Sequence, residues 1–226
     1  MYLDSWIKEL EVAVGDDKSN VTNKPKSDSN KQNEKVVKEK KEKSAAPTPP
    51  AAPVELNIHS LDLRVGLITS CVKHETADKL YCEEIDIGEP ENRPIASGLV
   101  KHYSLDQMQN RKVVVIANLA PRKLVGFKSH GMVLCAAKVM EDGEEKVEFV
   151  EVPADAKPGD RIVGEGLVVS AALSPKQVDK QKAWEILSPG FRSNENGIAY
   201  WNDVKLVVEG TSNHCYAPNL KGAMLR

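Results

Sequence analysis

The segment KVVVIANLAPRKL, residues 112–124, carries the signals that decide the fold. Residues 112–119 form an apolar run of strand length, which indicates a buried strand. This strand runs directly into a predicted loop that contains a proline, the two cations Arg122 and Lys123, and Gly126. We therefore expect Arg122 and Lys123 to lie at the rim of a β-structure, where cations can contact the phosphates of a nucleic acid.

Short strands on both sides of this segment predict a closed barrel. They are rich in apolar and β-branched residues, and a short helical turn over residues 104–111 lies among them. Such a succession predicts a mainly β protein with a five-stranded OB-fold barrel. The expected strands cover residues 63–74, 80–88, 93–100, 112–119, 131–139 and 146–153, and residues 154–163 are expected to make a closing turn.

The C-terminal residues 167–226 are expected to form a small α+β cap domain on the barrel domain, residues 56–166. Residues 174–187 have the spacing of an amphipathic helix. Residues 197–210 have the pattern of a β-hairpin with an Asn-Asp turn. A segment this short cannot bury a large core by itself, so we expect it to pack on the barrel.

The N-terminal part of the chain has a different composition. Residues 1–15 hold apolar side chains at helical spacing, and two interpretations stay open: a short docking helix for a partner, or a frayed terminus. Residues 16–55 hold no aromatic residue and are rich in Lys and then in Pro. They cannot bury enough surface to offset their ordering entropy, which predicts a disordered linker.

The charge of the chain is unevenly distributed. The formal net charge is only -2, so the composition alone does not indicate a nucleic-acid-binding protein. Residues 18–43 nevertheless carry nine lysines against four acidic residues. A flexible cationic arm releases counterions from phosphates without needing a defined shape. A linker that only increases solubility has the same composition, so both interpretations stay open.

The sequence contains no pattern for catalysis, a metal or a membrane span. None of the four cysteines forms a CxxC pair and the five histidines lack metal-binding spacing, so we expect reduced thiols, no metal and no cofactor. Nucleotide-binding glycine motifs and nucleophile motifs do not occur, which predicts that the chain is not an enzyme. No apolar run reaches the ~18 residues of a membrane span and no secretory signal occurs, which predicts a cytoplasmic protein.

Four motifs resemble those of a known family: LDLRVG, HETADKLYCEEIDIGE, SGLVKHY and NLAPRKLVGFKSHGMVLCAA, which begin at residues 61, 74, 97 and 118. They are similar to the tRNA-binding domain of the endothelial-monocyte-activating polypeptide II type. This domain occurs in methionyl-tRNA synthetases as a C-terminal appendix, in small free-standing proteins, and in a scaffold protein of the multisynthetase complex. The resemblance implies an OB-fold and, as in the scaffold group, a C-terminal domain that replaces a dimer partner. We therefore expect a monomeric unit.

The resemblance also implies where RNA would bind. The candidates at the barrel rim are Lys73, His74, Asn118, Arg122, Lys123 and Ser129, and those on the arm are Lys38, Lys40, Lys41 and Lys43. Two interpretations stay open for Lys73 and His74, which are either RNA contacts or solvated residues at a strand end. Arg64 in the first motif is open in the same way, because it is also a candidate for a structural ion pair.

The function that the resemblance implies is non-catalytic. The chain would bind tRNA by backbone and shape, and would deliver or retain it for aminoacyl-tRNA synthetases, its expected partners. Three alternatives stay open: a scaffold subunit of a multisynthetase complex in which RNA binding is secondary, the C-terminal part of a longer synthetase, and a signalling polypeptide released by proteolysis. The last of these rests on the resemblance alone.

Overall fold

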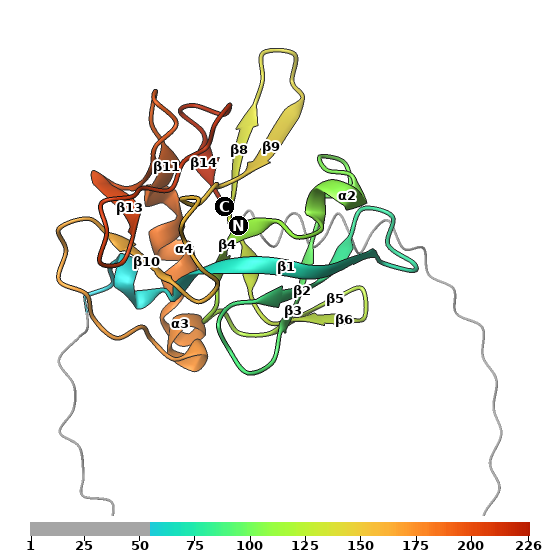
Figure 1. Ribbon diagram of the computed structural model, residues 1–226, viewed down its shortest axis with the longest axis horizontal. Helices are drawn as coiled ribbons and strands as arrows, with labels where there is room; N and C mark the ends of the chain where they lie inside the picture. The colour runs from blue at the N-terminus through green and yellow to red at the C-terminus, as the bar shows by residue number, and fades with distance from the viewer. Residues whose placement is uncertain (1–54) are drawn as a thin grey trace, which may run out of the picture. The chain divides into compact units, whose positions relative to one another are not determined.

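The computed structural model describes residues 55–226, which form a mainly β structure with short helices (Figure 1). Residues 1–54 lie outside the described part. The predicted docking helix over residues 1–15, almost all of the predicted linker, and the arm candidates Lys38, Lys40, Lys41 and Lys43 are therefore outside it as well.

The first strands pair around one long central strand. β1 (Leu63–Lys73) pairs along one edge with β2 (Tyr81–Asp86) and along the other with β4 (Lys112–Ile116), in both cases antiparallel. β2 pairs in turn with β3 (Arg93–Ser97), and β4 pairs with β7 (Met132–Val133). The strands expected in this region are thus present, joined in the order β3-β2-β1-β4-β7.

The expected closing turn leads into a strand that the sequence analysis did not predict. β10 (Arg161–Gly164) pairs with the beginning of β1, where Leu63 lies opposite Ile162. Its other edge pairs with β13 (Val204–Val208). The prediction of a turn through residue 163 was therefore wrong. The apolar residues Ile162 and Val163 belong to a strand that joins β1 to the C-terminal strand β13.

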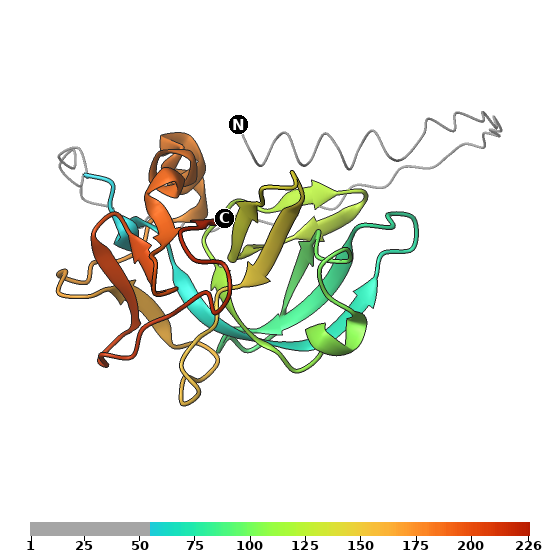
Figure 2. The same ribbon diagram turned by 90° about the horizontal axis from the view of Figure 1, so that it is seen from above.

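The pairing continues from β10 through the C-terminal segment and returns to the middle of the chain. The order after β13 is β12 (Ala199–Trp201), β11 (Phe191–Ser193), β14 (Met224–Leu225), β8 (Cys135–Val139) and β9 (Glu145–Phe149). Asn202, with φ at 52°, lies in the turn between β12 and β13, which confirms the predicted hairpin. Figure 2 shows the C-terminal elements gathered at one end of β1.

Two expected elements are divided in the structure. The strand expected over residues 131–139 is interrupted between β7 and β8. The helix expected over residues 174–187 is broken at Lys182, whose φ of 51° is left-handed, into α3 (Pro175–Gln181) and α4 (Ala183–Leu187). The break directs α4 toward the core, where Trp184 packs on the ring of Phe191 with centroids 5.8 Å apart.

One hydrophobic core runs from the first strands into the C-terminal segment. It joins Leu63 of β1 and Ile116 of β4 to Trp184, Phe191 and Leu206. Full burial of a large apolar side chain contributes about 1.5–3 kcal/mol, so this shared core binds the two parts firmly together. Residues 167–226 thus pack on the preceding strands, as the short length of the segment predicts.

A second core lies among β1 to β4 and β7 to β9, and the Glu83 carboxyl group is buried on the β2 strand beside it. Glu83 of β2 is only 1 % exposed. One of its oxygens accepts a hydrogen bond from the Ser97 hydroxyl, and the other has no partner among the described residues. Burial raises the pKa of Glu83 to about 8. The folded chain therefore keeps this proton at pH values at which the unfolded chain has released it.

This buried carboxyl group predicts a fall in stability with rising pH. Its contribution is fully present below the ordinary pKa of 4.5 and is lost as the pH rises through about 8. Above about pH 8, we expect Glu83→Gln to be more stable than wild type by on the order of a few kcal/mol in unfolding free energy, and therefore to unfold at a higher temperature. Near pH 4.5, the ordinary pKa of a glutamate, the variant should no longer be more stable than wild type.

Thermal unfolding followed by circular dichroism across this pH range measures the effect. Glu84→Gln is the matched control, because the neighbouring side chain is exposed. If wild type and Glu83→Gln had parallel stability curves, the account of Glu83 would be wrong.

Candidate nucleic-acid interface

The two cations of the segment that decides the fold lie on a β-hairpin and not in the loop that the sequence predicts. β5 (Arg122–Leu124) pairs with β6 (Phe127–Ser129), and Lys123 lies directly opposite Lys128. Both lysines are exposed. Like charges opposite one another on a sheet repel each other, and an anion lying across them relieves this repulsion.

The turn of this hairpin explains why it was missed. Val125 and Gly126 have φ angles of 45° and 92°, the pair of positive values that suits a two-residue hairpin turn. Glycine commonly adopts such a φ, but a β-branched valine does so rarely. The sequence signal was Gly126 between two triplets with strand-like alternation. The valine made that signal weak, and Lys128 was left out of the candidates.

Side chains on the inner face of the β5–β6 hairpin anchor it to the rest of the fold. Leu124 packs with Ala77, Leu80 and Ala96 in a small buried cluster, and Phe127 covers it. Two of these residues belong to the connection between β1 and β2, which begins directly after Lys73. This packing brings the end of β1 next to the cationic hairpin, two regions about fifty residues apart in the sequence.

Lys73 and His74, at the end of β1, have different environments. The Lys73 ammonium lies 3.1 Å from a carboxylate oxygen of Asp78, whose side chain is 97 % exposed. Such a surface ion pair is weak and leaves Lys73 available to a phosphate. His74 is half-buried, and its Nδ1 accepts hydrogen bonds from the backbone N–H groups of Thr76 and Ala77, each at 3.2 Å. Its ring therefore shapes the connection between β1 and β2.

Asn118 lies inside the structure and not on the rim surface. Its side-chain oxygen accepts a hydrogen bond from the N–H of Asp62 at 2.8 Å. Its amide nitrogen donates to the carbonyl oxygens of Ser60 at 3.0 Å and Leu173 at 2.9 Å. The amide thus joins the exit of β4, the entry of β1 and the segment before α3. These bonds use both amide hydrogens, so Asn118 positions the rim.

Ser129 has a comparable position. It is buried, and its hydroxyl accepts a hydrogen bond from the N–H of Ala96 at 3.1 Å and donates to the carbonyl of Gly131 at 3.0 Å. The bonds attach β6 to β3 and fix the segment that follows β6. The sequence motif makes Ser129 a candidate for RNA contact, but its hydroxyl is directed into the structure.

Arg93, a half-buried residue that the sequence analysis did not single out, also fixes the backbone on both sides of the β5–β6 hairpin. The Arg93 guanidinium donates to both carboxylate oxygens of Glu89 at 2.7 Å and to the carbonyl of His130 at 3.1 Å. It also donates to the carbonyl of Ala117. The contact therefore links β3 to the end of β4. Ala117 and His130 are far from Arg93 in the sequence, so no local pattern indicated these contacts.

Arg64 is a structural pairing residue in the described part. Its Nε lies 3.1 and 3.0 Å from the two carboxylate oxygens of Asp62, and its Nη2 lies 2.8 Å from one of them. The hydrogen bond to Asp62 raises the pKa of Arg64 further above its ordinary value. Of the two interpretations left open for Arg64, the structure therefore favours the ion pair.

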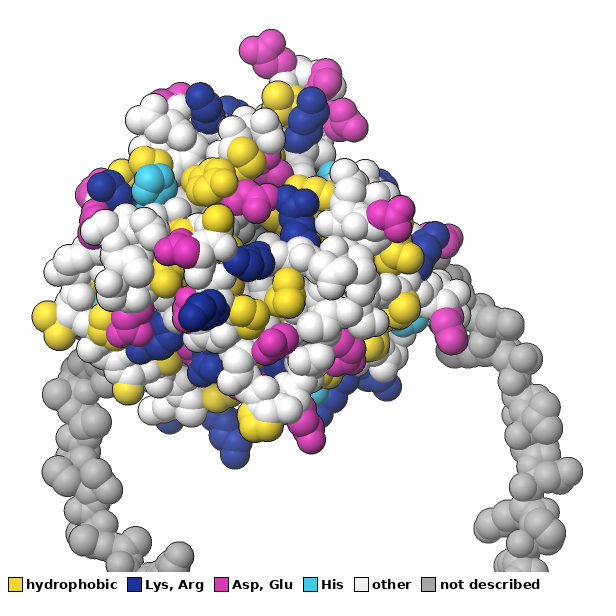
Figure 3. All heavy atoms as spheres, viewed as in Figure 1, with side chains coloured by type: hydrophobic (Ala, Val, Ile, Leu, Met, Phe, Trp, Pro, Cys, Tyr) yellow, Lys and Arg dark blue, Asp and Glu magenta, His cyan; other side chains and the backbone are white. Residues whose placement is uncertain are grey.

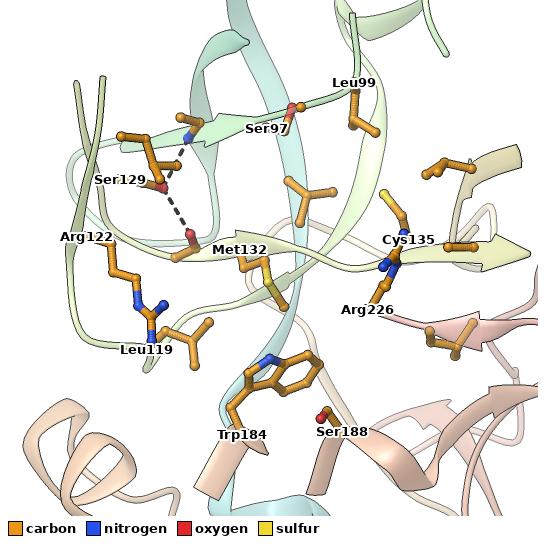
Figure 4. Close-up of a pocket in the computed structure, with 18 of the residues that line it drawn as sticks. Ser97, Leu99, Leu119, Arg122, Ser129, Met132, Cys135, Trp184, Ser188 and Arg226 are labelled. Carbon is orange, nitrogen blue, oxygen red and sulfur yellow. Dashed lines mark hydrogen bonds between the residues drawn. The ribbon is translucent and has the colours of Figure 1, made fainter. Parts of the chain in front are cut away.

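A cleft of about 420 Å³ adjoins the hairpin (Figure 4). Arg122 lies at one side of it, and Arg226 lies at the opposite side beside Cys135. Its floor is largely apolar and includes Leu119 and Met132, while Trp184 of α4 closes it from the C-terminal segment. The face shown in Figure 3 mixes Lys and Arg side chains with acidic and hydrophobic ones, in agreement with the near-neutral composition.

The cysteines are unsuited to chemistry at neutral pH. Burial raises the pKa of Cys71 and of Cys215 to about 12, and it raises the pKa of Cys135 as well. All four cysteines, including the half-buried Cys82, are unpaired thiols. Within residues 55–226, no group of three or more His, Cys, Asp or Glu side chains is placed to hold a metal ion. No helix in the same range is long and apolar enough to cross a membrane.

Comparison with known proteins identifies the kind of domain. Residues 63–161 match the family described as "Putative tRNA binding domain". Among solved structures, the C-terminal domain of p43 from Plasmodium vivax is similar, with a TM-score of 0.66 and 30% sequence identity. That alignment covers 76% of this chain and 100% of the p43 domain, so the likeness includes C-terminal residues beyond the matched family.

Two longer proteins are similar in sequence. The cytoplasmic methionine–tRNA ligase of Caenorhabditis elegans is 41% identical over 196 residues, which make up 85% of this chain and 20% of the ligase. The aminoacyl tRNA synthase complex-interacting multifunctional protein 1 of Cricetulus griseus is 41% identical over 174 residues, 76% of this chain and 45% of that protein. The chain thus spans less than half the length of either relative.

Proposed function

The chain belongs to the tRNA-binding domain family of the endothelial-monocyte-activating polypeptide II type, and on this basis we propose that it is a non-catalytic tRNA-binding protein. The observation that carries the proposal is the exposed pair Lys123 and Lys128, held opposite one another on a well-packed hairpin. A lysine is a compact point charge that contacts phosphate, and phosphate contacts carry no base sequence. The RNA is therefore bound by its backbone and shape.

The proposed contact surface consists of Lys73, Arg122, Lys123 and Lys128, with His74 at its edge. Asn118 and Ser129 act indirectly, because their hydrogen bonds hold the exit of β4 and the position of β6. Removal of either side chain would displace the cations, although neither group faces a phosphate.

We also propose that the first strands close into the five-stranded OB-type barrel. Two hydrogen bonds support closure between β3 and the segment around β6 and β7: the N–H of His130 donates to the carbonyl of Pro94 at 2.9 Å, and the N–H of Ala96 donates to the Ser129 hydroxyl at 3.1 Å. The rim of such a barrel is a common site for oligonucleotides.

The proposed domain organisation has four parts. Residues 56–166 form the tRNA-binding domain, and residues 167–226 form a cap that replaces a dimer partner, which makes the unit monomeric. The continuous hydrophobic core supports this role, because the cap covers apolar surface that a second copy would otherwise cover. Residues 16–55 are proposed as the linker, and residues 1–15 as a docking segment for a partner; residues 1–54 lie outside the described part.

The lysine-rich arm adds to the affinity. Lys38, Lys40, Lys41 and Lys43 lie close together in the sequence before the tRNA-binding domain, with only two glutamates among them. A tethered polycation increases the number of phosphates neutralised without requiring a fixed geometry.

The proposed partners are aminoacyl-tRNA synthetases in the cytoplasm, for which the chain delivers or retains tRNA. The similarity to a protein named for its interaction with the synthetase complex supports this role, and also its alternative, a scaffold subunit in which RNA binding is secondary. The similarity to part of a methionine–tRNA ligase favours a second alternative, the C-terminal part of a longer synthetase.

The salt dependence of tRNA binding tests the contact surface. Each lost phosphate contact lowers the slope of log K against log salt by about 0.7–0.9. For the full chain, we expect Lys123→Ala with Lys128→Ala to weaken binding and to make the slope shallower by about 1–2. The matched control is Lys157→Ala with Lys176→Ala, two exposed lysines on other elements. Equal slopes for the two double variants would contradict the proposal.

The same titration tests the arm. Replacing Lys38, Lys40, Lys41 and Lys43 by Gln is expected to make the slope shallower, whereas replacing them by Arg keeps the charge and the slope. An unchanged slope in the Gln variant would mean that the arm is only a linker.

Affinity purification of the full chain from cells tests the partners. After RNase treatment, we expect aminoacyl-tRNA synthetases to remain bound, and to be lost when residues 2–15 are deleted. Release of all synthetases by RNase would show that RNA alone joins them to the chain, and would refute direct docking.

A further inference from the structure

We propose that the cleft between β7–β8 and α4 is a subsite for one unpaired nucleobase of the bound RNA. This inference rests on the proposed function, because the RNA backbone must lie across the lysines of the β5–β6 hairpin for a neighbouring base to reach the cleft.

The shape and lining of the cleft suit a flat apolar ring. Leu119 and Met132 are directed into it from the side of β4 and β7, and Trp184 faces them from α4 (Figure 4). Its volume of about 420 Å³ lies within the range of ~300–1,000 Å³ that is usual for small-molecule sites. Burial of a base against such a surface is favourable for every base type, because each has an apolar face.

The charges of the cleft favour a base over a phosphate. Its lining contains the cations Arg122 and Arg226 and the acidic residues Asp179, Glu145 and Glu185. The Arg226 guanidinium pairs with the Glu145 carboxylate. The lining therefore lacks the excess of positive charge that a phosphate requires. A nucleobase is neutral, and its edge presents both N–H donors and carbonyl acceptors to such mixed groups.

The histidine in the lining does not change this balance. His102 is half-buried, and burial lowers its pKa below the ordinary value of 6.5. The imidazole is therefore neutral at pH 7 and adds a hydrogen-bonding edge without adding charge.

Arg122 connects the cleft to the cationic hairpin. Side chains alternate along a strand, so Arg122 lies on the face of β5 opposite to that of Lys123. Arg122 lines the cleft, whereas Lys123 and Lys128 are exposed on the outer face. An RNA strand that crosses the hairpin along these lysines can therefore turn one base past Arg122 into the cleft.

Contacts within the fold hold the walls of the cleft in place. Arg226 and Cys135 exchange two backbone hydrogen bonds of 2.8 Å, which fix the C-terminal residue at the side of the cleft. In the wall formed by α4, Trp184 is held by its contact with Phe191. A preformed site avoids the entropy cost of ordering its walls when it binds.

Filling the cleft tests the proposal. Ser188 lines the cleft, and its hydroxyl makes no hydrogen bond to another described residue. We compare Ser188→Trp with the matched control Ser212→Trp, which places the same side chain at an exposed position outside the cleft. Ala120→Trp, also in the lining, is the second cleft variant. The full chain is titrated with a labelled single-stranded RNA of about eight nucleotides and with a blunt-ended duplex of the same sequence.

We expect both cleft variants to bind the single strand at least about tenfold more weakly than wild type and to bind the duplex within about twofold. The control should match wild type with both RNAs. Unchanged binding of the single strand by both cleft variants would overturn the inference and leave the proposed function intact. Failure of wild type to bind tRNA, titrated in parallel, would instead refute the proposed function.

Two further outcomes would overturn the inference. An equal loss of duplex binding would mean that the new tryptophan disturbs the hairpin. The second outcome involves a leucine-rich peptide. If the peptide binds wild type but not Ser188→Trp, and the variant still binds the single strand, the cleft is a site for a protein ligand. Circular dichroism of each variant verifies that a loss of binding is not a loss of folding.

Discussion

The side-chain amide of Asn118 is the contact on which the arrangement of the rim depends. It joins the end of β4 to backbone groups of Ser60 and Asp62, which lie together at the entry of β1, and of Leu173 before α3, so three stretches far apart in the sequence meet at this amide. A buried amide that loses such partners costs about 1–3 kcal/mol for each unsatisfied group, so the three stretches are firmly held together. The cationic hairpin begins four residues later at Arg122, and its direction is set from this point.

In the proposed mode of RNA binding, the hairpin cations supply the charge and the cleft supplies the shape that is recognised. The chain has a net charge of -2, so the proposed attraction of RNA depends on where its cations are concentrated. Lys123 and Lys128 supply that charge on the outer face of the hairpin. The cleft behind Arg122 has balanced charges and apolar walls, and it suits a group that is neither a phosphate nor an ion. The two surfaces are adjacent because Arg122, which lines the cleft, lies on the same hairpin as the two lysines.

The sequence predicted the strands better than their connections. Short apolar runs identified β1 to β4, because burial of one face imposes a recognisable pattern on a strand. The hairpin of Arg122 and Lys123 was missed because Val125 occupies a turn position that glycine or asparagine usually occupies. The strand β10 was missed because its partners, β1 and β13, come from distant parts of the chain, and no local pattern records such pairing.

For the candidate site residues, the sequence could not give the direction of the side chains. Asn118 and Ser129 belong to the same motif as Arg122 and Lys123, and nothing in the motif distinguishes a buried polar group from an exposed one. Hydrogen bonds to remote backbone groups decide this, such as the bond from Asn118 to Leu173. The cleft could not be predicted, because its walls come from residues 96–147 and 178–226, which only the fold brings together.

The most direct test of the central claim is a map of where tRNA touches the protein. Backbone amide signals of the isotope-labelled full chain would be followed by NMR during titration with tRNA. The account predicts that the earliest and largest shifts occur in β5, β6 and the connection after Lys73, with smaller shifts along the cleft. Shifts confined to the β12–β13 hairpin, with β5 and β6 unaffected, would contradict it.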